Sequence, residues 1–428
     1  MLVVTITFLL FAMLAVGAPV GFALLVAGAI GLYFAGGTAL VLGILGTAPL
    51  SSVTAYEMIT VPLFLVMAEF VILSGVADRL FHAGTVWVGR APGGLGIATA
   101  LAGAGFGAIS GSSTASAAAL SSTTIPAMLK AGYEPKLACG AVAISGTLAM
   151  LIPPSIALVL YGIIADVSIG KLLVGGVVPG ILVTLTIIAT ILALVKMDPA
   201  RAPRGERYSW REKLLSLKVV GSMVFLFGAV TGVIYLGVAT PTEAAGIGAL
   251  GALVLAVAER KVNARTLRTT LANAAQATCM ILMIILGATV FGYFFTITEA
   301  TLSIVSWIQG LDAPRVAVLA LLLLLYLLLG CIMDQIAILI VTIPVVLPVI
   351  VALGYDPIWF GIIVIVTAEV GLLTPPVGLN VFVVARYAAR PLKEVFAGTF
   401  PHVLAHLLLI AVLVAFPQII LWLPSTMR

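Results

Sequence analysis

LIPPS at residues 151–155 and LTPPV at residues 373–377 are two similar stretches, and each lies inside a long apolar run. A pair of prolines removes two backbone hydrogen-bond donors, so a helix cannot continue through it undisturbed. We therefore predict two interrupted helices, one near residues 136–165 and its counterpart near residues 358–388.

The two stretches belong to a duplication that covers the whole chain. At an offset of 222 residues, seven prolines align with prolines, and GYEP at 132–135 aligns with GYDP at 354–357. At an ordinary proline usage of about 5%, less than one such pair of prolines is expected by chance. We predict two homologous units, residues 1–197 and 214–428, joined by a linker at residues 198–213.

The composition indicates that both units lie in a membrane. Hydrophobic residues make up 62% of the chain and charged residues 9%, and the mean hydropathy is +1.28; soluble domains have about 25% charged residues. Long unbroken runs such as residues 172–195 and 403–423 favour helices over the alternating strands of a membrane β-barrel. At roughly 20 residues per spanning helix the chain has room for about ten to twelve crossings. The sequence predicts an all-α polytopic membrane protein.

Each unit is predicted to contain about five transmembrane helices and one re-entrant helix hairpin, at residues 94–130 and 315–352. An odd number of crossings turns the second unit upside down relative to the first, which is the inverted-repeat plan of secondary transporters. The linker is rich in basic residues, and most other lysines and arginines fall on its side of the predicted topology. Basic loops face the cytoplasm, so we predict a cytoplasmic linker. The first hairpin then enters from the cytoplasm and the second from the outside.

A turn rich in serine and glycine joins the two helices of the first hairpin. Non-helical backbone at membrane depth is tolerated only where protein buries it or where it lines a water-filled cavity. Hydroxyl and carbonyl oxygens are the ligands that hard cations prefer. We predict a first Na⁺ site from this turn and the facing part of the first interrupted helix: Ser110, Gly111, Ser112, Ser113, Ser145, Gly146 and Thr147. The alternative is a packing face of small residues.

The turn of the second hairpin carries Asp334, which aligns with Ser112 at the offset of 222 residues. An acid at membrane depth is costly and is usually functional. We predict a second Na⁺ site, formed by Gly330, Met333, Asp334, Thr374, Pro375 and Gly378. Substrate is predicted to bind between the turns and the interrupted helices, at Ser113, Thr114, Pro153, Pro154, Ser155, Gln335, Pro376 and Asn380.

Three other acids lie in or beside apolar segments. Glu369 is a second candidate for a functional buried acid. Glu69 is equally compatible with packing or with a subunit contact. Glu243 follows Thr240 at helix-capping distance, and we expect it at a helix N-terminus.

The spacing of the cysteines and histidines does not indicate a metal site. Cys139, Cys279 and Cys331 stand singly in apolar segments and are expected to be core thiols. His402 and His406 are four residues apart, but no third ligand lies nearby. We therefore expect no transition metal, and the absence of a nucleotide-binding P-loop argues against ATP hydrolysis by this chain.

Four segments together resemble the large membrane subunit of tripartite ATP-independent periplasmic (TRAP) transporters. They are GFGAISGSS at 105–113, the region from Ile125 to Tyr133, the Pro153–Pro154 break, and GLLTPPVGLN at 371–380. The resemblance covers essentially the whole chain. It implies a multi-pass protein of the bacterial inner membrane in which a transport domain moves as an elevator against a scaffold.

The same resemblance implies the function and the partners. Members take up small organic acids, such as C4-dicarboxylates or sialic acid, by coupling to Na⁺, and no cofactor beyond that ion is implied. The implied partners are a small four-helix membrane subunit and a soluble periplasmic substrate-binding protein.

Other functions are less compatible with the residues. A self-sufficient Na⁺- or H⁺-coupled anion carrier or antiporter of the same superfamily remains the alternative. An intramembrane enzyme would need a nucleophile with a base, or a metal cluster, and no such constellation is present in the sequence. The basic residues lie in loops and form no nucleic-acid-binding patch, so we expect no nucleic-acid partner.

Overall fold

The computed structural model describes residues 1–310 and 313–427, and these residues form helices joined by short loops, without a β-strand. The first half of the chain contains α1 (Leu2–Ala15), α2 (Val20–Val53), η1 (Tyr56–Ile59), α3 (Thr60–Ser74), α4 (Val76–Val88), α5 (Gly94–Ser110), α6 (Ser113–Lys130), α7 (Pro135–Thr147), η2 (Leu148–Met150), α8 (Ile156–Ile164) and α9 (Ile169–Met197).

The second half begins after a short 3-10 turn in the linker, η3 (Pro199–Arg201). It contains α10 (Trp210–Tyr235), α11 (Pro241–Ala258), α12 (Ala264–Ile297), α13 (Ala300–Gln309), α14 (Arg315–Gly330), α15 (Gln335–Ala352), α16 (Pro357–Gly371), α17 (Leu379–Ala388), α18 (Leu392–Ala415) and α19 (Gln418–Ser425).

Eight helical segments in the described residues are long and apolar enough to cross a membrane. They are α2, the continuous segment of η1 and α3, α9, α10, α11, α12, α15 and α18. The chain is therefore a multi-pass α-helical membrane protein, as its composition predicts. The count of five crossings per unit stays a prediction.

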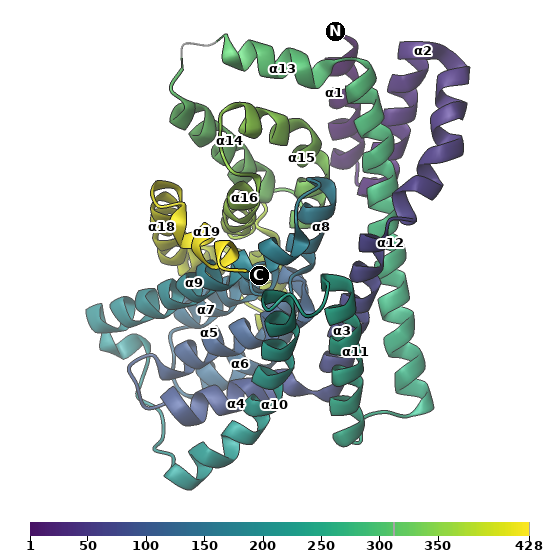
Figure 1. Ribbon diagram of the computed structural model, residues 1–428. Coiled ribbons are helices and arrows are strands. Elements are labelled where there is room, and N and C mark those ends of the chain that lie inside the picture. Colours follow the sequence, from purple (N-terminus) through teal and green to yellow (C-terminus); the bar gives the residue numbers. More distant parts are fainter. Residues whose placement is uncertain (311–312, 428) are drawn as a thin grey trace.

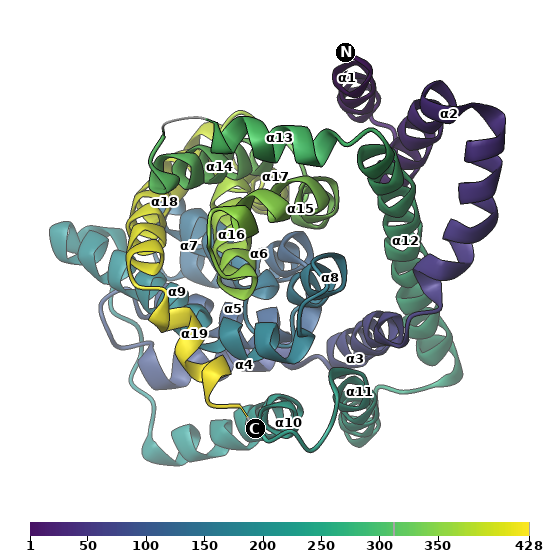
Figure 2. The ribbon, with the colours of Figure 1, turned by 45° about the horizontal axis from the view of Figure 1, so that its top comes forward.

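The helices form two groups (Figures 1 and 2). The framework helices are α1, α2, α3, α10, α11 and α12: α2 packs on α12, α3 packs on α11, and α10 packs on α11 and α4. The central cluster contains α5 to α9 and α14 to α18. The short helices α4 and α13 connect the two groups in the chain, and Figure 1 shows α13 lying across one end of the molecule.

Corresponding elements recur in the two halves at the offset of 222 residues. α6 and α15 have 18 residues each and begin at Ser113 and Gln335. α7 and α16 begin at Pro135 and Pro357, which have the same separation. Each of the two is followed by a non-helical break and a short helix, α8 or α17. The opposite orientation of the halves in the membrane stays a prediction.

Several boundaries differ from those expected from sequence. From sequence we expect a span near residues 19–35, but α2 has 34 residues and continues past the non-helical Gly36 and Gly37. α4 and α13 were not expected, and the last span is divided into α18 and α19 near Pro417. α10 begins at Trp210, which is inside the expected linker.

Glycines allow the closest helix crossings of the central cluster. A Cβ atom added to Gly140 on α7 would collide with the backbone of Gly398 on α18. One added to Gly330 on α14 would lie 2.8 Å from the Cα of Gly371 on α16. Backbones approach this closely in membrane proteins only through small residues, so these crossings hold the cluster together.

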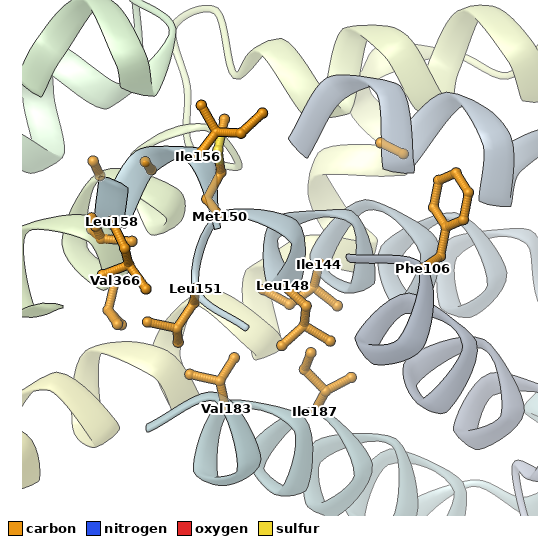
Figure 3. Close-up of a cluster of buried hydrophobic side chains, with 14 of the residues drawn as sticks. Phe106, Ile144, Leu148, Met150, Leu151, Ile156, Leu158, Val183, Ile187 and Val366 are labelled. Carbon is orange, nitrogen blue, oxygen red and sulfur yellow. The ribbon is translucent and has the colours of Figure 1, made fainter. Parts of the chain in front are cut away.

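Apolar side chains fill the space around the first interrupted helix. Leu148 and Leu151 are fully buried beside the break, and Val183 and Ile187 of α9 lie opposite them (Figure 3). This packing covers the first break from the side of α9.

Candidate functional site

The two polar turns are shaped by equivalent helix caps. The Ser112 hydroxyl accepts a hydrogen bond from the Ala115 N–H (3.4 Å) at the start of α6. The Asp334 carboxylate accepts one from the Ile336 N–H (3.1 Å) at the start of α15. Serine and aspartate are preferred N-cap residues. The two aligned residues therefore have the same local role, and Asp334 alone adds a charge.

Hydroxyl groups of the first turn bond mainly to one another. Ser110 and Ser116 are joined by a 2.5 Å hydrogen bond, and Ser112 and Thr114 by one of 3.3 Å. Ser110 and Ser116 are buried, as is Gly111 at the tip. The turn is thus a compact group of oxygens inside protein.

The facing part of α7 is also buried. Ser145 donates to the Ala141 carbonyl oxygen (2.5 Å) and Thr147 to the Ile144 carbonyl oxygen (2.7 Å). A hydroxyl has one proton and two lone pairs, so both oxygens can still accept. Gly146 allows α7 to approach Ala117 of α6. Among the described residues, no hydrogen bond joins these hydroxyls to the first turn, and helix packing brings the two parts together.

One hydrogen bond joins the first turn to the second interrupted helix. Asn380 Nδ2 donates to Ser113 Oγ over 2.6 Å, and both side chains are fully buried. The two residues are 267 positions apart in sequence. A residue of the first predicted Na⁺ site thus contacts a residue of the predicted substrate site in the other half.

The second turn contacts the second break in the same way. Cys331 Sγ lies 2.9 Å from Thr374 Oγ1, and the Gly378 N–H donates to the Cys331 carbonyl oxygen (3.0 Å). Three residues of the second predicted Na⁺ site, Gly330, Thr374 and Gly378, therefore lie around this contact. Met333 and Asp334 are partly exposed beside it.

The two breaks differ in their exposure. Pro153, Pro154 and Ser155 are buried, and Ser155 both donates to the Met150 carbonyl oxygen and caps α8. Pro375 and Pro376 are exposed. The first break is therefore an interior element, whereas the second lies at the surface of the chain.

Three buried side chains of the second half have an oxygen without a hydrogen-bond partner among the described residues: Gln335 Oε1, Glu369 Oε1 and Asn380 Oδ1. Gln335 donates its amide to the Ile365 carbonyl oxygen (3.1 Å). A carbonyl can only accept, so this bond fixes the Gln335 amide and leaves its oxygen free. Asn380 faces a hydroxyl, which can donate or accept, so its amide can be turned either way.

Sequence reasoning missed two polar contacts of the second hairpin. Cys331 was expected to be a simple core thiol, but it faces Thr374. Tyr326 and Thr342 form a buried 2.8 Å hydrogen bond between α14 and α15. The sequence offered one signal for the second contact: Tyr326 and Thr342 are polar residues within the apolar runs of α14 and α15.

Glu243, Glu69 and His406 have structural partners, whereas neither ring nitrogen of His402 has one among the described residues. Glu243 forms a capping box with Thr240, as expected. Glu69 accepts a 3.3 Å hydrogen bond from Asn273 of α12, which makes it a contact between framework helices. His406 Nδ1 lies 2.7 Å from the His402 carbonyl oxygen. Cys139 is buried as expected, but Cys279 is exposed, so that prediction was wrong.

Two interrupted helices, with two polar turns that meet at the second of them, lie within a multi-pass helical bundle and define a membrane transport protein. The fold matches that of the Alcanivorax borkumensis YdaH transporter, with a TM-score of 0.68 at 16% identity over 94% of this chain and 98% of that one. The family model described as "Tripartite ATP-independent periplasmic transporter, DctM component" matches residues 7–419, and the chain belongs to this family.

Two relatives are named as transport proteins. The chain is 35% identical to the C4-dicarboxylate TRAP transporter large permease protein DctM of Pseudomonas aeruginosa, over 86% of each chain. It is 33% identical to the isethionate TRAP transporter permease protein DctMQ of Oleidesulfovibrio alaskensis, over 82% of this chain and 55% of that protein. This chain is thus a TRAP large permease.

Proposed function

We propose that this permease couples the uptake of a small organic acid to Na⁺ entry across a bacterial inner membrane. The names of the two relatives support an organic acid as the substrate, since one name contains C4-dicarboxylate and the other isethionate. The bond between Ser113 and Asn380 is the observation that carries the proposal, because it joins the polar turn of one half to the interrupted helix of the other.

Na⁺ coupling is supported by acceptor oxygens that lack partners. An unsatisfied polar atom in a protein interior costs free energy, and a hard cation is a suitable partner for amide, hydroxyl and carboxylate oxygens. Gln335 presents such an oxygen beside Asp334. Gln335 was predicted from sequence to bind the anionic substrate, but its free oxygen is better suited to bind a cation.

The acid group of the substrate is proposed to lie near Asn380. The N-termini of α6 and α17 meet at the Ser113–Asn380 contact, and helix N-termini favour negative charge. Asn380 can offer an N–H to a carboxylate when its amide is turned. Thr114, Pro153, Pro154, Ser155 and Pro376 complete the proposed substrate set.

Transport is proposed to occur by an elevator movement of the central cluster against the framework helices, within an inverted repeat. The proposed partners are a small four-helix membrane subunit and a periplasmic substrate-binding protein. The name DctMQ and greater length of the isethionate relative support a membrane partner that can also be fused to this subunit.

Reconstitution tests the proposal. Proteoliposomes containing the permease, the small subunit and the binding protein are given a Na⁺ gradient and a panel of labelled organic acids. We expect uptake only with all three components, and loss of uptake when Na⁺ is replaced by K⁺. Comparable uptake by the permease alone would instead identify a self-sufficient carrier, and uptake independent of Na⁺ would refute the coupling.

A further inference from the structure

A large apolar cavity lies between α10 and the helices α4, α5 and α9, and it reaches Ile152 and Pro153 at the first break. Its volume is about 1050 Å³, and none of its lining residues is charged. The few polar side chains are largely engaged: Trp87 donates to Ser216, Thr184 to the Gly180 carbonyl oxygen, and Tyr235 is bonded to Thr426. An occupant must therefore be mainly hydrocarbon.

The cavity is open toward the side of the molecule. Ile181 and Leu185 on α9 and Val224 on α10 line it, and each is more than half exposed. Gly228 and Gly232 also line it, and a Cβ atom added to either would meet nothing within 4 Å. The cavity therefore has free space beside these two glycines of α10.

The length of the cavity fits one hydrocarbon layer. Its lining on α10 runs from Leu217 to Tyr235, which at 1.5 Å per residue is roughly 27 Å. The hydrocarbon core of a bilayer is about 30 Å thick. Trp87 at one end and Tyr235 at the other are the residue types that mark the two membrane interfaces.

A cation stands at the end marked by Trp87. Lys213 Nζ lies 5.8 Å from the Trp87 ring centroid and 5.0 Å from that of Trp210. The segment 204–213 carries four basic residues and two acids, so its net charge is +2. One of the acids, Glu212, is engaged in the capping box of α10. An anionic headgroup would be attracted to this end.

We propose that the cavity between α10 and α4, α5 and α9 binds one anionic phospholipid. Its acyl chains lie along Gly228 and Gly232, and its headgroup phosphate binds Lys213. The lipid fills the space between α10, a framework helix, and the central cluster (Figure 1). No residue of the two predicted Na⁺ sites lines this space, and Pro153 is the one residue of the predicted substrate set that does.

Native mass spectrometry of the purified permease in nanodiscs tests this site. Nanodiscs contain equal amounts of palmitoyl-oleoyl phosphatidylglycerol and phosphatidylcholine, and the lipid retained after release is counted. We expect the wild type to retain about one phosphatidylglycerol per chain. Lys213→Gln should lower the phosphatidylglycerol to phosphatidylcholine ratio at least fivefold, whereas Lys261→Gln, at another exposed basic residue, should not change it.

Variants that fill the cavity with a larger side chain provide a second, independent test of the lipid site. Gly228→Phe should reduce retention of both lipids at least fivefold, and Val224→Trp provides a second filling variant in case Gly228→Phe does not fold. Gly43→Phe is the matched control, since Gly43 is equally open but lies on α2. Retention without preference for phosphatidylglycerol, or unchanged retention in the filled variants, would overturn the proposal. Full displacement of the lipid by the bound small subunit would also overturn it and would assign the cavity to that subunit.

Discussion

At the scale of single residues, Asp334 has a structural role and a proposed ionic role that one substitution separates. Asparagine is as good an N-cap as aspartate, so Asp334→Asn should keep the start of α15 intact and remove only the charge. We expect Na⁺-driven uptake to fall at least tenfold, with a melting temperature close to that of the wild type. Uptake and its Na⁺ dependence are measured in proteoliposomes with the partner proteins present.

Ser112→Ala is the control at the equivalent position. It removes the cap of α6, which costs about 1 kcal/mol of stability, but leaves every charge in place. We expect a lower melting temperature with Na⁺-dependent uptake largely retained. If Asp334→Asn transports with unchanged Na⁺ dependence, the carboxylate is only a cap and the second Na⁺ site is wrongly assigned.

Residue-level predictions from sequence succeeded where the signal was local. Thr240 and Glu243 are three positions apart, and their capping box follows from that spacing alone. The contacts of Ser113 with Asn380 and of Cys331 with Thr374 join distant segments, and nothing in one sequence specifies which side chains meet across a fold. The turns could thus be predicted as polar sites, but their bonding partners could not.

At the scale of elements, the crossing of α14 and α16 should tolerate no side chain. In Gly330→Ala the new Cβ would lie 2.6 Å from the Ala368 carbonyl oxygen and 2.8 Å from the Gly371 Cα. Backbone atoms cannot turn away, so we expect a loss of roughly 1–3 kcal/mol, as for other overpacked sites, and a displaced second turn. Thermal unfolding in detergent measures the first effect and Na⁺-driven uptake the second.

Gly292→Ala on α12 is the matched control, because its Cβ would meet nothing within 4 Å. Alanine in a helix is more stable than glycine by roughly 0.5–1 kcal/mol, so this variant should be unchanged or slightly stabilised. Equal melting temperatures for the two variants would show that α14 and α16 are not packed as closely as Gly330 and Gly371 require.

The ion pair between Arg79 on α4 and Glu259 at the end of α11 predicts a pH effect. The hydrogen bond from Arg79 lowers the pKa of Glu259 below its ordinary value of 4.5. A lowered carboxyl pKa stabilises the fold above that ordinary value, and this stabilisation is lost as the pH falls through the folded-state pKa. Both side chains are partly exposed, so the contribution is about 0.2–1 kcal/mol.

Melting temperatures of the wild type and Glu259→Gln, compared at pH 7 and at pH 3.5, measure this contribution. We expect the variant to be slightly less stable at pH 7 and the two proteins to converge in acid. A difference that is constant with pH would mean that the pair does not stabilise the contact of α4 with the framework.

Which elements could be predicted depended on how apolar they are. The pairs α5–α6 and α14–α15 lie in long apolar runs separated by polar turns, and their positions follow from the sequence. α4 contains Arg79 and His82 among its apolar residues, and α13 has ten residues. Both fall short of a transmembrane pattern, so they were missed. The extension of α2 was missed because Gly36 and Gly37 look like the end of a helix.

At the scale of the whole molecule, the membrane class could be recognised from the composition and the family from four sequence segments, whereas the duplication stays a prediction. The orientation of the two halves depends instead on counting crossings. Between the linker and α13 the structure has three helices long enough to span a membrane, α10, α11 and α12. If all three cross the membrane, the linker and α13 lie on opposite sides, as the predicted inverted repeat requires.

Single-cysteine labelling tests this count directly. Cys139, Cys279 and Cys331 are first replaced by alanine, and one cysteine is then placed at each of four exposed positions: Arg204 in the linker, Val238 after α10, Lys261 after α11, and Ser306 on α13. Each crossing reverses the side, so in right-side-out vesicles an impermeant maleimide should label Val238→Cys and Ser306→Cys. Arg204→Cys and Lys261→Cys should react only in inside-out vesicles, because their basic loops face the cytoplasm. Labelling of Arg204→Cys and Ser306→Cys from the same side would mean an even number of crossings between them, and the second half could not then be inverted relative to the first in the way proposed.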